Sequence, residues 1–152
     1  MSTYTATIRW SRTGDGDFTK GQYSRAHDWA FDGGLTVPAS PSPHIVPVPW
    51  NNPNGVDPEE AFVASLSSCH MLFFVDFARR DGCVVDAYVD EAEGALEKRA
   101  DGKTAMTRVT LRPRVTWGGA APDEAGIADL HHRAHEACFI ANSVTTEVKV
   151  EP

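Results

Sequence analysis

The amino-acid sequence predicts an α+β domain in which two helices pack on antiparallel β-sheet. Three observations indicate this class: two segments with apolar residues at helical spacing, five segments that alternate like strands, and no internal repeat. The expected order is two strands, a long loop, a helix, two strands, a second helix and a last strand. At 152 residues, the chain fits one domain, which we expect to span residues 1–152.

Two strands are expected before the first helix. Residues 3–10 alternate between polar and apolar side chains, and residues 22–31 form a second plausible strand. The segment from Pro38 to Pro58 holds seven prolines, which excludes regular structure there. Because ordered loops of this length are usually functional, we interpret it as a loop laid over a site.

The first helix has a recognisable start. Asp57 can cap it, Pro58 suits its first turn, and Glu60 completes an arrangement like a capping box. Asp81-Gly82 is expected to end it. One apolar stripe at helical spacing follows the start: Phe62, Leu66, Cys69, Phe73 and Phe77.

The second half of the chain repeats the alternation of strand and helix. Residues 84–96 and 104–117 are predicted as two long strands around a turn at residues 99–102. A second helix opens at Pro122-Asp123-Glu124, and residues 143–150 alternate as a last strand. The expected inner face of the second helix is Ile127, Leu130, Ala134 and Cys138.

Composition excludes some partners. The formal net charge of −7 disfavours both a nucleic-acid groove and an anionic membrane surface, so we expect neither nucleic acid nor membrane as partner. No run of 18 apolar residues and no basic start followed by an apolar run occurs, which predicts a cytoplasmic protein.

Cys69 and Cys138 are the most informative residues, because each is expected on the apolar face of its own helix. In a chain expected to be cytoplasmic, a disulfide is more often catalytic or redox-sensing than structural. We therefore interpret the pair as a thiol–disulfide couple. The third cysteine, Cys83, follows a glycine where a strand begins, and a structural role is expected for it.

At these residues the sequence resembles the OsmC/Ohr superfamily, that is, osmotically inducible protein C and organic hydroperoxide resistance proteins. Residues 57–60 running into 67–72 look like its first motif, and residues 135–143 look like its second. Residues 23–28 and 40–43 look like those of an OsmC-like branch. The resemblance implies an intertwined homodimer in which antiparallel sheets enclose central helices, and an enzyme that reduces organic hydroperoxides.

The resemblance also implies residue roles. Cys69 takes the position of the peroxidatic cysteine, Cys138 that of the resolving cysteine, and Glu59 that of the family's glutamate. Arg25 is the choice for the family's arginine, with Arg9 and Arg12 as alternatives. No bound cofactor is implied. Electrons would come from an external thiol reductant such as a protein-bound dihydrolipoyl group.

The chemistry independently requires a cation. Peroxide reduction needs a thiolate, whereas an ordinary cysteine thiol, with a pKa of about 8.5, is mostly protonated at neutral pH. Cys69 is too far from Asp57 for the helix dipole to act, and burial opposes ionisation, so an arginine beside the sulfur is needed. In one continuous helix Glu59 lies about 15 Å along the axis from Cys69, which favours its action across a dimer.

Three rival functions remain. Cys69, His70, His135 and Cys138 offer ligand types that suit zinc. A non-catalytic OsmC-like protein that binds a small apolar ligand or a partner is the alternative to the enzyme. A cysteine acyl hydrolase ranks last, because no histidine–carboxylate partner stands at helical spacing from Cys69. His131 and His132 are expected at the surface.

Overall fold

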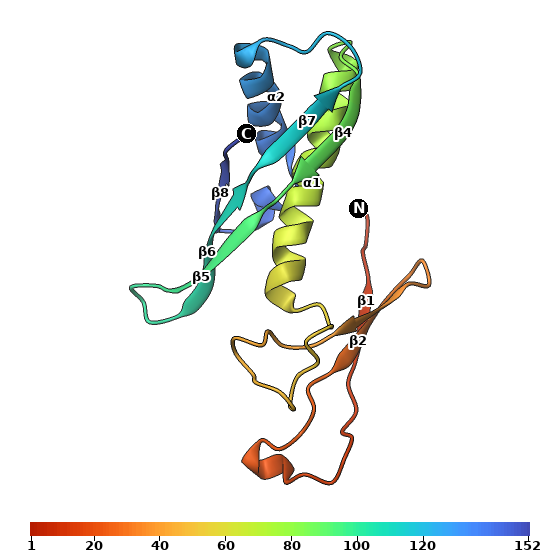
Figure 1. The fold of residues 1–152 in the computed structure, drawn as a ribbon, viewed down its shortest axis with the longest axis vertical. Helices are drawn as coiled ribbons and strands as arrows, with labels where there is room; N and C mark the ends of the chain where they lie inside the picture. Colours follow the sequence, from red (N-terminus) through yellow and green to blue (C-terminus); the bar gives the residue numbers. More distant parts are fainter. The chain divides into compact units, whose positions relative to one another are not determined.

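The computed structural model describes all 152 residues, which form two compact units. The first unit is Met1–Ala61 and the second is Phe62–Pro152. Each unit is described by itself below, with the element labels of Figure 1. Helices and sheets occur together, as expected for an α+β protein.

The first unit is built on a three-stranded antiparallel sheet. Strand β1 (Ala6–Arg9) pairs with β2 (His27–Phe31), and β2 pairs with β3 (Thr36–Ala39). A short 3-10 helix, η1 (Phe18–Lys20), lies between β1 and β2 in the sequence. Both predicted strands exist, but each is shorter than the alternation suggested.

The proline-rich segment differs from the prediction at its start. Pro38 lies inside β3, which is an edge strand, where a residue without an N–H group is tolerated. The rest of the segment is a loop, and its end returns to the sheet through a parallel bridge between Ala39 and Val56. The Ser40 N–H donates to the Val56 carbonyl at 3.0 Å. The loop is therefore tied to the sheet at both of its ends.

Helix α1 (Pro58–Arg80) starts and stops where the sequence indicated. The Asp57 carboxylate accepts a hydrogen bond from the Glu60 N–H at 2.7 Å, and the Glu60 carboxylate accepts one from the Asp57 N–H at 3.2 Å. This reciprocal pair is a capping box. After the last turn, Gly82 adopts a φ of 80°, a conformation that glycine adopts without strain.

The second unit contains two further sheets. Strand β4 (Val85–Asp90) pairs antiparallel with β7 (Pro113–Trp117). Strand β5 (Glu93–Lys98) pairs antiparallel with β6 (Thr104–Leu111), and β6 pairs parallel with β8 (Glu147–Val150). The sheets are antiparallel as predicted, except for this last pairing, which makes the β5–β6–β8 sheet mixed.

Each predicted long strand is in fact two strands that belong to different sheets. The Asp90 carboxylate accepts the Arg112 N–H at 2.6 Å, so a side chain replaces a ladder bond at this point. Pro113, the next residue, has no N–H to donate. The ladder is interrupted at the same level on both strands, and alternation alone does not reveal such a break.

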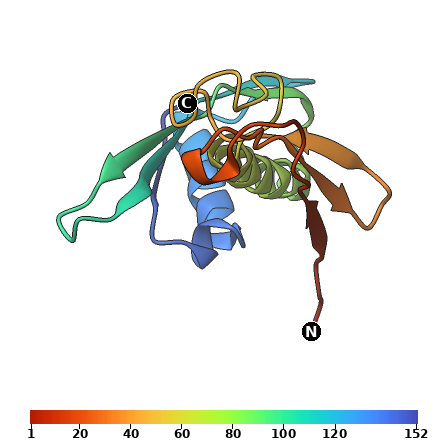
Figure 2. The same cartoon turned by 90° about the horizontal axis from the view of Figure 1, so that it is seen from below.

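Helix α2 (Glu124–Ala137) begins at Asp123, whose carboxylate accepts the Gly126 N–H at 2.8 Å. Figures 1 and 2 show α1 and α2 on the same face of the β4–β7 ribbon. The core between them contains the buried residues Phe74, Ala78, Leu130 and Ala134. Against this cluster pack half-buried residues from the ribbon: Val85, Tyr88, Val115 and Trp117.

A second core cluster joins the first half of α1 to the other sheet. It consists of Leu66 from α1 with Val109 and Leu111 from β6. Cys69 lies on α1 between the levels of Leu66 and Phe74, and therefore between the two clusters. By length and composition alone, α1 is apolar enough to cross a bilayer, a test that core helices of soluble proteins also pass.

Candidate active site

The structure brings the two predicted thiols together within the second unit. Cys69 is half-buried near the middle of α1, whereas Cys138 is only 1% exposed. Burial, followed by a hydrogen bond with the Cys69 side chain, raises the pKa of Cys138 to about 11. Cys138 therefore keeps its proton at neutral pH, and Cys69 lies close enough to contribute to the raised pKa of Cys138. Of the two thiols, Cys69 is therefore the more accessible one and the candidate nucleophile.

Cys138 sits in a tight turn rather than in a helix. Helix α2 ends at Ala137, and Cys138 is its C-cap, so the predicted place of Cys138 on the helix face is wrong by one residue. The Ala141 N–H donates to the Cys138 sulfur at 3.4 Å, and the Asn142 N–H donates to its carbonyl at 3.0 Å. The backbone of this turn thus fixes the sulfur against α1.

The buried stripe of α1 differs from the predicted one. Its most buried residues are spaced by four: Leu66, His70, Phe74 and Ala78. Of the predicted stripe only Leu66 is fully buried, and Cys69 is half-buried at the edge of the packed face. The apolar pattern misplaced the inner face of α1 by about one residue, because positions 73 and 74 are both phenylalanine and the pattern selects Phe73. The displacement leaves Cys69 partly accessible, as a nucleophile requires.

Arg25 lies in the first unit, in the loop that precedes β2 rather than on the strand predicted for it. Its guanidinium carbon is 4.0 Å from the centroid of the Tyr23 ring. The same group donates to the Tyr23 carbonyl at 3.0 Å and to the Gly21 carbonyl at 3.3 Å. These contacts hold the guanidinium without engaging any carboxylate, so its charge remains available for a ligand.

Glu59, the second residue of α1, lines a cavity of about 240 Å³ together with Arg25. The loop residues Pro41, Ser42 and Ile45 complete its wall, with His27 and Pro58. The proline-rich loop therefore does border a pocket. Arg25 and Glu59 form no ion pair there, although both face the same space. Arg9 and Arg12, the alternative arginines, line neither this cavity nor the next one.

A second cavity in the first unit, of about 370 Å³, shares Arg25 and His27 with the first. Its other walls are the apolar side chains Ile8, Trp10, Phe18 and Tyr23. The Phe18 and Tyr23 ring centroids are 4.5 Å apart, and Trp10 stands edge-on to Tyr23 at 5.7 Å. Sequence reasoning missed this aromatic group. The signal was present as three aromatic residues around one glycine-rich turn.

The second unit contains a buried histidine pair that the sequence did not predict. The His70 Nε2 and His131 Nδ1 atoms are 3.0 Å apart, and the two ring centroids are 5.3 Å apart with the rings close to parallel. Burial lowers the pKa of both imidazoles to about 4. His131 was expected at the surface but is 5% exposed, whereas His132 is exposed. The i+4 spacing of His70 from Leu66 was the signal for its burial.

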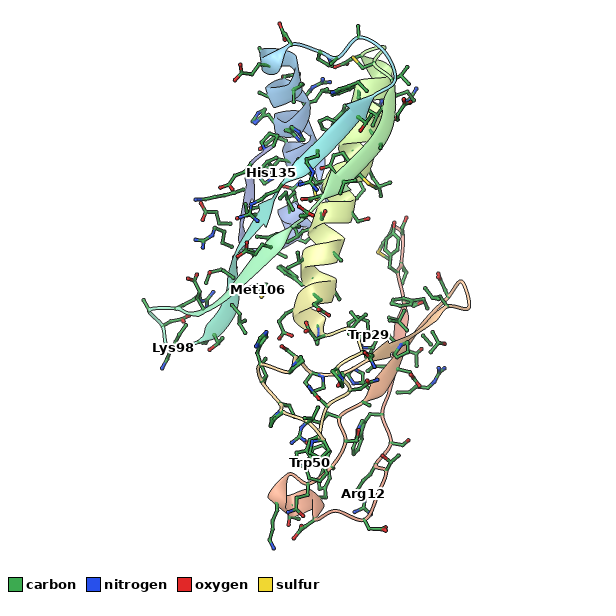
Figure 3. The ribbon with its side chains drawn as sticks, viewed as in Figure 1. Arg12, Trp29, Trp50, Lys98, Met106 and His135 are labelled. Carbon is green, nitrogen blue, oxygen red and sulfur yellow. The ribbon has the colours of Figure 1, made fainter.

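The other residues that the sequence singled out lie outside the contacts described above. His135 on α2, labelled in Figure 3, is half-buried and makes no side-chain hydrogen bond. Cys83 packs against the core cluster of Phe74 and Leu130, as expected of a structural residue. No group of three or more histidine, cysteine or acidic side chains is arranged to hold a metal ion. The zinc interpretation thus lacks a ligand set.

A family model of OsmC-like proteins matches residues 51–152, two thirds of the chain. The chain belongs to the OsmC-like family. The matched region contains Glu59, Cys69 and Cys138, whereas Arg25 lies upstream of it. No protein with a curated description matches the sequence.

Solved structures agree with this membership. An OsmC-like protein of unknown function from Vibrio cholerae is 52% identical, with a TM-score of 0.96 and 99% of each chain covered. Two more distant structures share the fold of this OsmC-like chain. An organic hydroperoxide resistance protein OsmC from Legionella pneumophila is 18% identical, with a TM-score of 0.69 over 99% of this chain and 97% of that one. The organic hydroperoxide resistance protein OhrB of Bacillus subtilis is 22% identical, with a TM-score of 0.64 and 97% of each chain covered.

Proposed function

We propose that this OsmC-like protein is a thiol-dependent peroxidase that reduces organic hydroperoxides to alcohols. The observation that carries the proposal is that half-buried Cys69 lies beside buried Cys138, whose thiol keeps its proton at neutral pH. Such a pair suits a cycle in which one sulfur attacks and the other resolves. The names of the distant structural relatives from Legionella pneumophila and Bacillus subtilis agree with this chemistry.

In the proposed cycle the Cys69 thiolate attacks the distal oxygen of the hydroperoxide. The O–O bond breaks, the alkoxide takes up a proton and leaves as alcohol, and Cys69 becomes a sulfenic acid. The Cys138 sulfur then forms a bond to the Cys69 sulfur. The Cys138 proton and the sulfenic hydroxyl leave together as water. An external dithiol, such as a protein-bound dihydrolipoyl group, returns both cysteines to thiols by exchange.

Arg25 is the cation that we propose for activation of Cys69, with Glu59 as its orienting carboxylate. Both residues line one cavity of the same chain, and Arg25 has no acidic partner. Helix α1 is continuous, so ten residues separate Glu59 from Cys69 by about 15 Å along its axis. We therefore propose that Arg25 and Glu59 serve, as a unit, the Cys69 of a second copy.

A homodimer is part of this proposal. Exposed apolar side chains adjoin both cysteines: Leu72, one turn after Cys69, is 63% exposed, and Phe139, next to Cys138, is 71% exposed. Apolar surface beside a reactive thiol favours coverage by a second copy. Light scattering behind gel filtration should give twice the 16.5 kDa chain mass.

Mixed dimers test the assignment of Arg25. Neither Cys69→Ser nor Arg25→Met alone should turn over hydroperoxide at an appreciable rate. Refolding the two variants together should restore part of the activity if Arg25 acts on the partner's cysteine, because one complete site then forms. Restored activity supports action across the dimer. Absence of any recovery in verified mixed dimers contradicts it.

Cys138→Ser tests the roles of the two thiols. One equivalent of hydroperoxide should convert Cys69 of this variant to a sulfenic acid that dimedone traps, because no resolving thiol is present. Mass spectrometry should locate the adduct on Cys69, with Cys83→Ser as the control that leaves the cycle intact. An adduct on Cys83, or none at all, would overturn the proposed roles.

The second candidate function is binding of a small apolar ligand without turnover. The aromatic cavity of about 370 Å³ favours it, because apolar walls with one cation suit a ligand with a single acidic or polar end. The relative from Vibrio cholerae, of unknown function, neither supports nor opposes this role. Quenching of Trp10 fluorescence by fatty acids, without thiol loss, would favour the binding protein.

A further inference from the structure

His70 and His131 form a direct hydrogen bond between α1, which carries Cys69, and α2, which ends directly before Cys138. His70 follows Cys69 on α1, and His131 lies seven residues, about two turns, before Cys138 at the end of α2. The bond joins His70 Nε2 to His131 Nδ1 at 3.0 Å, and the rings are within 12° of parallel. A second link joins the same elements near the end of α1, where Arg133 of α2 donates to the carboxylate of Asp81, the residue that follows the helix.

Both imidazoles are neutral at pH 7 and buried among the side chains of neighbouring elements. The Phe74 ring stacks on His131 at 4.4 Å, while His135 lies near His70 and Asp90 of β4 lies near His131. The Asp90 carboxylate accepts hydrogen bonds from Ser67 and from the Arg112 N–H. Neither imidazole bonds to a carboxylate. One ring must therefore donate its N–H and the other accept, which fixes complementary tautomers along the bond.

The pair also carries a cost that a packing role would not explain. The outer nitrogens, His70 Nδ1 and His131 Nε2, are buried and have no hydrogen-bond partner. An unpartnered buried polar atom destabilises the fold, and two leucines would fill this space without it. A hydrogen bond adds to simple packing a fixed separation and a fixed register of the two helices.

We propose that His70 and His131 are positioning residues that hold α1 and the end of α2 in the register at which the Cys69 and Cys138 sulfurs meet. A disulfide forms only within a narrow range of Cα separation, so a small slide of one helix along the other would disfavour it. The inference rests on the proposed function for its biological meaning. Its test uses only the thiol–disulfide equilibrium and needs no hydroperoxide.

The test is the equilibrium constant of the Cys69–Cys138 disulfide against dithiothreitol, read by alkylation and mass spectrometry. His131→Leu keeps apolar volume and removes the bond, whereas His131→Asn places an amide atom close to the position of Nδ1. For His70, Gln is the corresponding mimic of Nε2 and Leu the matched loss. We expect each Leu variant to form the disulfide about tenfold less favourably, as loss of one hydrogen bond predicts, and each mimic to recover most of it.

Single Leu variants leave one buried histidine without its partner and can fold poorly. The double variant His70→Leu/His131→Leu avoids this problem and still removes the hydrogen bond. It removes both unpartnered nitrogens together with the bond, so we expect it to fold at least as stably as the wild type in urea. A disulfide equilibrium about tenfold weaker in this folded variant supports positioning by the hydrogen bond. An equilibrium equal to the wild type's shows that packing alone sets the register and overturns the inference.

Failure of the proposed function would look different. A wild-type protein that forms the disulfide readily but ignores hydroperoxides contradicts the peroxidase and leaves the positioning role intact. A wild-type protein that never forms a Cys69–Cys138 disulfide contradicts both.

Discussion

The two units of this OsmC-like chain differ in what they bury. Every large buried apolar side chain, among them Leu66, Phe74, Leu111 and Leu130, lies in the second unit. The first unit buries only small or polar residues: Ala39, Ser40, Ser42, Asn51 and Asp57. The second unit is therefore a packed scaffold for the thiols, whereas the first presents a cation and aromatic walls with little core of its own.

This contrast indicates a division of labour. Fixed packing suits the two sulfurs, because the disulfide proposed between them would require a defined distance. An open aromatic surface with a free guanidinium suits recognition of a ligand and of a second copy. Asn51 of the first unit even has both side-chain polar atoms buried without a partner, which is consistent with a region completed by further contacts.

The largest expected difference concerns stability. Phe74→Ala should lower the free energy of unfolding by about 3–5 kcal/mol, because it empties the core between α1 and α2. Phe18→Ala in the first unit should cost about 1 kcal/mol or less, since Phe18 is 45% exposed. Urea unfolding followed by circular dichroism measures both. Equal losses would remove the distinction between the units.

The second largest effect is expected on the rate of thiol oxidation when the Arg25 charge is removed. Arg25→Met should slow thiol loss to organic hydroperoxide by about 10²–10³-fold, the usual cost of removing a charge-stabilising donor. Arg9→Met and Arg12→Met are matched controls, because these exposed arginines line neither cavity. A larger effect of either control substitution would assign the activation of Cys69 to that arginine instead of Arg25. The cavities lined by Arg25 would then have no support as part of the active site.

Acid should destabilise the second unit through its histidine pair. In the folded protein the pKa values of His70 and His131 are lowered from 6.5 to about 4, so the unfolded chain binds protons first as the pH falls. Stability is complete above pH 6.5 and declines between there and about pH 4. For one imidazole the full decline is roughly 3 kcal/mol.

The His70→Leu/His131→Leu variant is the control for this pH effect. Its urea midpoint should fall less than the wild type's between pH 7 and pH 4.5, because only the wild type loses the neutral pair. Parallel declines in the two proteins would show that other groups, such as Asp90 near His131, govern the acid response.

The smallest effect is expected at the start of α1. Asp57→Ala removes one half of the capping box with Glu60 and should cost about 1 kcal/mol, whereas Asp57→Asn should cost less, because it keeps an acceptor. Thermal unfolding is sufficient to rank the two. A loss well above that of Phe74→Ala would mean that Asp57 does more than cap the helix.

Much of the fold could be predicted because its signals are local. The boundaries of α1 follow from Asp57, Pro58 and Gly82, whose effects act within one turn. The breaks in the long strands could not be predicted, because the Asp90 carboxylate that interrupts the ladder bonds to Arg112, far away in the sequence. Likewise, the parallel pairing of β8 with β6 depends on contacts that alternation does not encode.

The residues of the candidate site were also predictable from the sequence only in part. Cys69 and Cys138 could be found because cysteine is rare and each lies in a distinctive segment. The partnership of His70 with His131 could not, since helical spacing shows that a histidine faces inward but not what it meets there. Arg25 was placed on a strand, yet its position is set by the ring of Tyr23 and by two carbonyl groups.

The most direct test of the central claim is the loss of thiols from reduced protein on mixing with cumene hydroperoxide or with hydrogen peroxide. The account predicts that the wild type rapidly loses two thiols per chain with the organic peroxide and reacts slowly with hydrogen peroxide, while Cys69→Ser does neither. If neither peroxide consumes thiols faster than it consumes free cysteine, Cys69 is not an activated nucleophile. The peroxidase proposal would then give way to ligand binding.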